Sequence, residues 1–130
     1  ISIEYLDGIV EEYGPFYGIL GYSQGCPMAT VYIANSNTSF EKAFLFNGYL
    51  PTTHSGLNDT INEVAPLDVD ALIFGGANDV FMFGVQELAG VYHEPTIVIS
   101  STADHYLPFS DDEAYGDVLA FFREGTNGNL

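Results

Sequence analysis

The sequence predicts an α/β protein in which parallel strands alternate with helices. Short apolar runs bounded by Gly, Pro, Asn or Asp recur four times along the chain. Between and around these runs lie stretches with apolar residues three or four positions apart, as on one face of a helix. The run 71–74 has no polar position, which is typical of a strand that a parallel sheet buries on both faces. Strands and helices in this order pair the strands in parallel through right-handed crossovers.

The strands are expected at 16–20, 42–46, 71–74 and 96–100. The last of these is the most β-branched run of the chain, Thr96-Ile97-Val98-Ile99-Ser100, and β-branched residues favour strands. The expected helices are 2–12, 28–34, a segment through Val85, Leu88, Ala89 and Tyr92, and 112–123, with a weaker indication of a short helix from Leu57 to Val64. The last helix is expected to place Ala114, Val118, Leu119 and Phe122 on one face, and 125–129 is expected to be a frayed end.

Composition and charge exclude several classes of partner. The chain of 130 residues, with 47% hydrophobic residues, is expected to form a single domain, 1–130, with a real core. Its 18 acidic residues against Lys42 and Arg123 give a net charge of -16, which repels nucleic acid and anionic membrane surfaces. No apolar run approaches the roughly 18 residues that a membrane span needs. We therefore expect no nucleic acid partner and no membrane span.

Cysteine and histidine usage argues against a disulfide or a zinc site. The single cysteine, Cys26, has no partner for an internal disulfide, and no group of Cys and His residues has the spacing of zinc ligands. We expect no metal, no cofactor and a reducing compartment, the cytoplasm. Cys26 is expected to be a small packing residue that faces the sheet.

The most informative stretch is Gly21-Tyr22-Ser23-Gln24-Gly25, a Gly-x-Ser-x-Gly between the first predicted strand and the helix after it. In this pattern, a nucleophile elbow, the chain turns sharply from strand to helix, and small residues on both sides let the backbone close around the serine at strained dihedral angles. The serine is then exposed at the carboxyl edge of the sheet. The pattern predicts that Ser23 is a nucleophile and that the backbone N–H of Gln24 contributes to an oxyanion hole.

Two further candidates follow predicted strands at the same edge: Asp79 after the third strand and His105 after the fourth. In the order serine, acid, histidine, the serine attacks, the histidine takes its proton, and the carboxylate fixes the imidazole tautomer. Asp104 is a rival for the acid, although sequence neighbours rarely present side chains to one another in the needed geometry. His54 and His93 are expected at the surface. We expect substrate contacts from Tyr22, Tyr49, Val80 and Tyr106.

Four motifs occur in order along the chain: Gly14-Pro15-Phe16-Tyr17-Gly18-Ile19-Leu20-Gly21-Tyr22-Ser23-Gln24-Gly25, Phe46-Asn47-Gly48-Tyr49, Gly75-Gly76-Ala77-Asn78-Asp79 and Asp104-His105-Tyr106-Leu107-Pro108. Together they resemble the fungal-type serine hydrolase family (FSH). The resemblance implies an α/β-hydrolase fold, a catalytic triad at Ser23, Asp79 and His105, and hydrolysis of a small acyl ester or thioester.

The chain departs from the family pattern in two ways. Ala103-Asp104 stands where the family has Gly-Gly before the histidine, which is expected to affect the position of the His105 loop. The chain also begins at the helix before the elbow strand, so we expect a truncated fold that lacks the amino-terminal strands. One oxyanion amide of the family comes from a loop in that part. The first strand would then have an exposed edge, and we expect another chain, a second copy or the missing amino-terminal half to cover it.

Two functions from different classes follow from these observations. The first is a serine esterase or thioesterase that works through an acyl-enzyme. The second is a catalytically weak or inactive hydrolase-like domain that serves as a structural or interaction subunit. Loss of one oxyanion donor lowers rates by about a hundredfold to a thousandfold, which favours the second. The four ordered motifs favour the first.

Overall fold

The described residues, 2–36 and 39–123 of this computed structural model, form a parallel sheet of four strands in the order β1-β2-β3-β4. The strands are β1 (Gly18–Tyr22), β2 (Lys42–Phe46), β3 (Asp70–Gly76) and β4 (Thr96–Ser100). Each strand lies beside the next in sequence because a crossover containing a helix connects the two. The predicted α/β class with about four parallel strands is confirmed.

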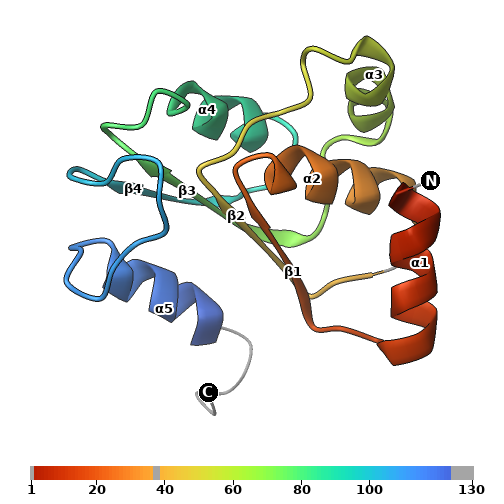
Figure 1. The fold of residues 1–130 in the computed structure, drawn as a ribbon, viewed down its shortest axis with the longest axis horizontal. Coiled ribbons are helices and arrows are strands. Elements are labelled where there is room, and N and C mark those ends of the chain that lie inside the picture. Colours follow the sequence, from red (N-terminus) through yellow and green to blue (C-terminus); the bar gives the residue numbers. More distant parts are fainter. Residues whose placement is uncertain (1, 37–38, 124–130) are drawn as a thin grey trace.

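The helices of the described residues are α1 (Ser2–Tyr13), α2 (Gly25–Asn35), α3 (Ser55–Val64), α4 (Phe83–Ala89) and α5 (Tyr115–Arg123). Helices α2, α3 and α4 lie on one side of the sheet and α5 lies on the other, whereas α1 stands beside the β1 end (Figure 1). Asp7 on α1 accepts hydrogen bonds from the Tyr32 hydroxyl, at 2.7 Å, and from the Ser36 hydroxyl, at 3.0 Å, so α1 is joined to the end of α2.

The sheet separates two hydrophobic cores. The core on the α2, α3 and α4 side contains Cys26, Leu45, Ile61, Ile73 and Val85. The core on the α5 side contains Phe44, Phe46, Leu72, Phe74, Val98, Val118 and Phe121. Because successive strand residues point to opposite faces, β2 and β3 need apolar side chains at nearly every position. This explains why the run 71–74 has no polar residue.

Two boundaries near the elbow differ from the sequence-based predictions. Strand β1 is Gly18–Tyr22 rather than 16–20, because pairing with β2 begins only where Tyr17 O accepts from Glu41 N–H at 2.8 Å. Helix α2 begins at Gly25 rather than at residue 28, since Cys26 N–H already donates to Ser23 O at 3.0 Å. The strand therefore passes into the helix within two residues, Ser23 and Gln24.

The ends of the last two helices also differ from prediction. Helix α4 ends at Ala89, because Gly90 N–H caps it by donating to Gln86 O at 3.1 Å, and Tyr92 instead pairs with Leu67 in an isolated bridge. Helix α5 begins at Tyr115 rather than at residue 112. The Asp112 carboxylate accepts from the Ser100 hydroxyl at 2.6 Å and from Ala114 N–H at 2.8 Å, which holds this segment in a turn.

The core-facing side of α5 is also corrected. Val118 and Phe121 are buried, whereas Phe122, which was predicted to share the buried face, is 38% exposed and stacks on Phe44 with ring centroids 4.4 Å apart. The predicted frayed end at 125–129 lies outside the described residues.

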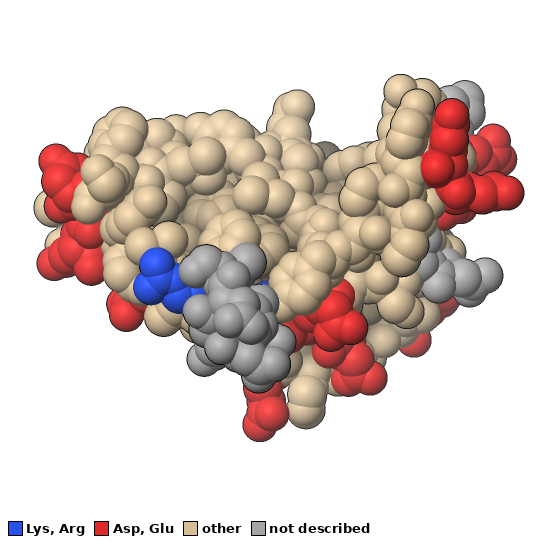
Figure 2. All heavy atoms as spheres, turned by 90° about the horizontal axis from the view of Figure 1, so that it is seen from below, with Lys and Arg blue, Asp and Glu red and all other residues tan. Residues whose placement is uncertain are grey.

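Charge is distributed unevenly between surface and interior. Acidic side chains lie at the two ends and along one long edge of the face seen from the α5 side (Figure 2). Lys42, by contrast, is 3% exposed: its ammonium group donates to Phe121 O, lies 4.1 Å from the centroid of the Phe121 ring, and is 3.8 Å from Asp70 Oδ2. One of the two basic residues of the chain therefore holds the end of α5 against β2.

Within the described residues, no helix has the length and apolar character required to cross a bilayer. The cytoplasmic location stays a prediction.

Among the described glycines, Gly84, at the start of α4, has the least space for a side chain. A Cβ at Gly84 would lie 1.8 Å from Gly48 O, and a Cβ at Gly48 would in turn lie 2.2 Å from Cys26 Sγ, so the Gly48 backbone has no space to retreat. We expect Gly84→Ala to lower the free energy of unfolding by about 3 kcal/mol, measured by urea denaturation.

The matched control is Gly8→Ala in α1, where a Cβ meets nothing within 4 Å. It should raise the free energy of unfolding by about 0.5–1 kcal/mol, because alanine loses less conformational entropy than glycine in a helix. A Gly84→Ala midpoint equal to that of the parent protein would contradict the close packing of α4 on Gly48.

Candidate active site

The elbow between β1 and α2 presents Ser23 at the carboxyl end of the sheet. Ser23 adopts a left-handed backbone with φ 54° and donates its N–H to Phe46 O, the last residue of β2, at 2.9 Å. A Cβ at Gly21 would lie 2.7 Å from Gly25 O, so the strand and the helix approach each other as closely as the pattern Gly-x-Ser-x-Gly predicts.

Ser23, His105 and Asp79 lie in line at this edge. Ser23 Oγ is 2.8 Å from His105 Nε2, and His105 Nδ1 is 2.8 Å from Asp79 Oδ2. The rival acid, Asp104, directs its carboxylate to the backbone N–H of His105 at 2.7 Å. The structure thus brings together the three residues that the sequence indicated and gives the imidazole contact to Asp79.

The Asp79 carboxyl group is buried but accepts several hydrogen bonds. Burial by itself raises a carboxyl pKa, but hydrogen bonds from His105, from Phe81 N–H at 2.9 Å and from Asn47 Nδ2 at 3.2 Å outweigh it, so the pKa of Asp79 lies below its ordinary value. Asp79 is therefore charged at neutral pH. Because the pKa is lower in the folded state, the carboxylate stabilises the fold above about pH 4, and this stabilisation is lost as the pH falls through the lowered pKa.

The loop that carries His105 is held from several sides. The Tyr22 hydroxyl donates to His105 O at 2.6 Å, and the Phe81 ring lies 5.2 Å from the imidazole. Ala103 O accepts from Asn78 N–H at 3.0 Å, and a Cβ at Gly76 would lie 2.4 Å from the same oxygen. The loop therefore rests directly on the end of β3. With Ala103-Asp104 in place of Gly-Gly, His105 still lies within hydrogen-bond distance of Ser23 and Asp79.

Gln24 lies between Ser23 and the first turn of α2. None of the hydrogen bonds found among the described residues uses its backbone N–H. A free amide at the start of a helix favours negative charge, both through its own dipole and through that of the helix. This position suits the oxyanion role expected for Gln24.

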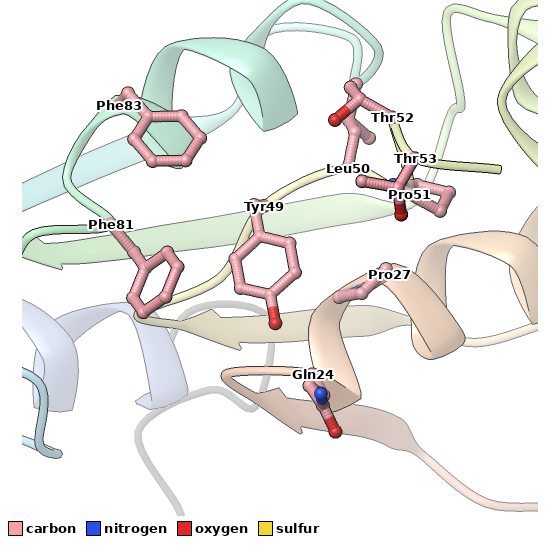
Figure 3. Close-up of a pocket in the computed structure, with 9 residues that line it drawn as sticks. All are labelled: Gln24, Pro27, Tyr49, Leu50, Pro51, Thr52, Thr53, Phe81 and Phe83. Carbon is pink, nitrogen blue, oxygen red and sulfur yellow. The ribbon is translucent and has the colours of Figure 1, made fainter. Parts of the chain in front are cut away.

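A pocket of about 480 Å³ opens beside Gln24 (Figure 3). Gln24 and Pro27 lie on one side of it, Phe81 and Phe83 on the other, and the Tyr49 ring lies between them. The remaining lining residues are Leu50, Pro51, Thr52 and Thr53. The pocket is lined mostly by apolar and aromatic groups, as small-molecule sites commonly are.

Of the four residues expected to contact substrate, Tyr49 lines this pocket. Tyr22 lies against His105, Val80 is 81% exposed, and Tyr106 stacks on Phe109 with ring centroids 5.0 Å apart, so the structure does not bring these three to the pocket. Phe81, which is next to Val80 in sequence, lines the pocket, and its ring lies 5.2 Å from Tyr49 and from His105 alike. The one signal for Phe81 in the sequence is its position two residues after Asp79.

The hydrogen bonds of the Cys26 and His54 side chains do not reach the side chains of Ser23, Asp79 or His105. His54 and His93 are exposed as predicted, and His54 Nδ1 also accepts from Leu57 N–H at 3.2 Å, which caps α3. Cys26 is buried against the sheet as predicted, and burial raises the pKa of its thiol to about 12. In the described part of the chain, no group of three His, Cys, Asp or Glu side chains is arranged to hold a metal ion.

The fold is similar to that of solved esterases. Esterase PE8 matches with a TM-score of 0.71 and 17% identity over 95% of this chain and 58% of that one. The esterase domain of a Rhodothermus marinus protein matches with a TM-score of 0.64 and 18% identity, over 93% of this chain and 68% of that one. The Bacillus cereus carboxylesterase matches with a TM-score of 0.65 and 19% identity, over 94% of this chain and 57% of that one.

These likenesses establish an α/β-hydrolase fold, of which the chain spans a little over half the length of PE8 and of the Bacillus cereus enzyme. No curated protein matches the chain. The family model described as "Serine hydrolase (FSH1)" matches residues 1–115, which include all four motifs. The chain therefore belongs to the FSH1 serine hydrolase family.

Proposed function

We propose that this protein hydrolyses a carboxylic ester or thioester through Ser23, His105 and Asp79 and an acyl-enzyme. The observation that carries the proposal is the line of contacts from Ser23 Oγ to His105 Nε2 and from His105 Nδ1 to Asp79 Oδ2, each 2.8 Å. Both distances suit proton transfer and tautomer control without rearrangement.

In this mechanism Ser23 Oγ attacks the substrate carbonyl carbon while its proton passes to His105 Nε2. The Asp79 carboxylate accepts a hydrogen bond from His105 Nδ1–H and stabilises the imidazolium, and Gln24 N–H donates to the developing oxyanion. His105 then gives the proton to the departing alcohol or thiol, which leaves the acyl group on Ser23. Water attacks the acyl-enzyme with His105 as the base, and the acid is released as Ser23 regains its proton.

The pocket beside Gln24 supports an uncharged, apolar substrate group. Its lining is mostly aromatic and aliphatic, and it lies next to the amide that would face the oxyanion. A chain with a net charge of -16 disfavours strongly anionic substrates by long-range repulsion. Short uncharged acyl esters are therefore the first substrates to test.

The second function is a weak or inactive hydrolase-like subunit, and the supply of oxyanion donors bears on it. An oxyanion hole of this fold has two N–H donors, and Gln24 is the one that we identify within the described residues. Removal of one of two donors lowers kcat by about a hundredfold to a thousandfold.

A fluorophosphonate distinguishes the two functions, because it reacts covalently with a serine that has a working base. We expect intact mass spectrometry of the native protein to show one adduct and peptide mapping to place it on Ser23. A protein that melts cooperatively but gives no adduct would overturn the hydrolase proposal and support the structural role.

We also propose that further polypeptide covers the free edge of β1 in the working protein. Among the described residues β1 pairs with β2 alone, and Leu20 is 54% exposed. Natural edge strands are protected by charge, a bulge or proline, and Gly18–Tyr22 has none of these. The covering segment is another chain, a second copy or an additional part of this protein.

The expected result is that the isolated chain of 130 residues is not a stable active monomer. Sedimentation velocity should show self-association, because the apolar edge is left in water. Variants are compared with the parent protein in that associated form. A monodisperse monomer that melts cooperatively and hydrolyses p-nitrophenyl butyrate would contradict this proposal.

A further inference from the structure

Asn47 is a buried polar residue at the point where β2 ends. It is 1% exposed and adopts a left-handed backbone with φ 56°, which asparagine tolerates better than most residues. Its N–H donates to Phe74 O on β3 at 2.9 Å, so the backbone at this position is fixed by the sheet. The sequence marks Asn47-Gly48 as the end of a strand and as part of the motif Phe46-Asn47-Gly48-Tyr49, without a role for the Asn47 side chain.

The side chain of Asn47 joins the two loops that carry the acid and the base. Its Nδ2 donates to Asp79 Oδ2 at 3.2 Å and to Asp104 O at 3.2 Å. Both partners are acceptors, which fixes the orientation of the amide. The Asp79 oxygen that receives this bond is the same one that faces His105 Nδ1. Asp104 directly precedes His105, so Asn47 contacts both sides of the acid–base pair.

Asparagine is not the residue that folding stability alone would favour at position 47. Asn47 Oδ1 is buried, and among the described residues it has no hydrogen-bond partner. A buried acceptor without a partner destabilises the folded state, and so does a left-handed backbone at a residue other than glycine. Glycine would avoid both costs. What asparagine adds is a pair of donor hydrogens aimed at Asp79 and Asp104.

We propose that Asn47 is a positioning residue that holds the Asp79 carboxylate and the His105 loop in the geometry needed for proton transfer. The proposal rests on the proposed function, because it assigns Asn47 to the reaction of Ser23. The two donor bonds restrict the carboxylate so that Oδ2 stays opposite Nδ1. They also fix the distance between the Asp79 loop and the His105 loop.

Asn78 provides a matched control within the same two loops. Its Nδ2 donates to Thr102 O at 3.1 Å, so it also joins the loop after β3 to the loop after β4, but none of its hydrogen bonds reaches Ser23, Asp79 or His105. A role limited to tying the loops together predicts similar effects for Asn47 and Asn78. A positioning role predicts an effect for Asn47 alone.

The first test is steady-state kinetics with p-nitrophenyl butyrate for Asn47→Gly, Asn47→Asp and Asn78→Ala. Glycine accepts the left-handed backbone and removes the donors, while aspartate keeps the shape but places a second carboxyl beside Asp79. We expect both Asn47 variants to lower kcat by about 10- to 100-fold with KM within about threefold, and Asn78→Ala to leave both within about threefold. Full kcat in both Asn47 variants, or an equal loss in Asn78→Ala, would overturn the proposal.

The second test does not depend on hydrolysis. The proton between His105 Nδ1 and Asp79 should give a low-field signal in the proton NMR spectrum. The two other histidines, His54 and His93, are exposed and have no hydrogen bond to Asp79. We expect this signal to move or broaden in Asn47→Gly and to persist in Asn78→Ala.

The two tests separate the possible failures. An unchanged low-field signal in a folded Asn47→Gly protein would overturn the positioning role even if the enzyme is active. A changed signal in a protein without esterase activity would support the positioning of Asp79 and His105 while the hydrolase proposal fails. Asn47→Asp keeps the side-chain volume, so it serves where Asn47→Gly does not fold.

Discussion

Replacing Ser23 with alanine is expected to lower kcat for p-nitrophenyl butyrate by about 10⁶-fold and to abolish labelling by the fluorophosphonate. The alanine methyl group cannot attack the carbonyl, and His105 then has no proton to accept from it. The residual rate comes from the oxyanion donor and from substrate binding, which the change leaves in place. KM should change little, because Ser23 does not line the pocket that binds the apolar group.

Ser55→Ala is the matched control for this change. Ser55 is exposed at the start of α3 and has no contact with His105. Its variant should retain the parent kcat and the parent labelling. A Ser23→Ala protein that still takes up the label would show that another residue is the nucleophile.

Asp79→Asn is expected to lower kcat by about 10⁴-fold while the protein stays folded. An amide cannot accept from every donor that the carboxylate serves, because its NH2 end would face either Asn47 Nδ2 and His105 Nδ1 or the Phe81 N–H. The tautomer of His105 that leaves Nε2 free to accept the Ser23 proton is then no longer held in place. The neutral amide also no longer stabilises the imidazolium that forms during attack.

Asp104→Asn separates the two candidate acids. The Asp104 carboxylate contacts a backbone N–H and is exposed, so its variant should keep kcat within about threefold of the parent value. The measurement is kcat for both variants between pH 6 and pH 8. A large loss in Asp104→Asn with a small one in Asp79→Asn would transfer the acid role to Asp104.

The parts of the fold that the sequence predicts well are those in which local pattern and burial agree. Strands β2 and β4 have the predicted bounds, because their apolar runs are flanked by residues that end pairing. The predicted start of helix α5, at residue 112, lies before its observed start at Tyr115. The Asp112 carboxylate binds the Ser100 hydroxyl of β4, and no local pattern reports a hydrogen bond that depends on tertiary packing.

The candidate site likewise has a part that the sequence predicts and a part that it does not. Ser23, Asp79 and His105 each follow a strand of a parallel sheet, so topology alone places them at one edge. The pocket depends instead on which of two neighbouring residues in a loop turns inward. Val80 and Phe81 are adjacent, yet Val80 faces solvent and Phe81 contacts both Tyr49 and His105. Loop dihedral angles decide this, and the sequence carries no periodic signal for them.

Asn47 was missed for a related reason. Asn-Gly after a strand is an ordinary turn signal, and nothing nearby in sequence shows that the amide meets Asp79, 32 residues further on. Its role becomes visible only once the register of β2 against β3 is known.

The hydrogen bond from the Tyr22 hydroxyl to His105 O has a consequence for the order of folding. It joins residues 83 apart in sequence, and the neighbouring contact between Ser23 and His105 joins residues 82 apart. Closing so long a loop costs conformational entropy that only the completed sheet offsets, so these contacts form after the intervening strands have paired. We therefore expect a refolding chain to regain its helical circular dichroism before His105 reaches Ser23. The reactivity of Ser23 would then report the fraction of molecules in which the last crossover has packed on the sheet. The fraction folded according to the helical signal would be larger.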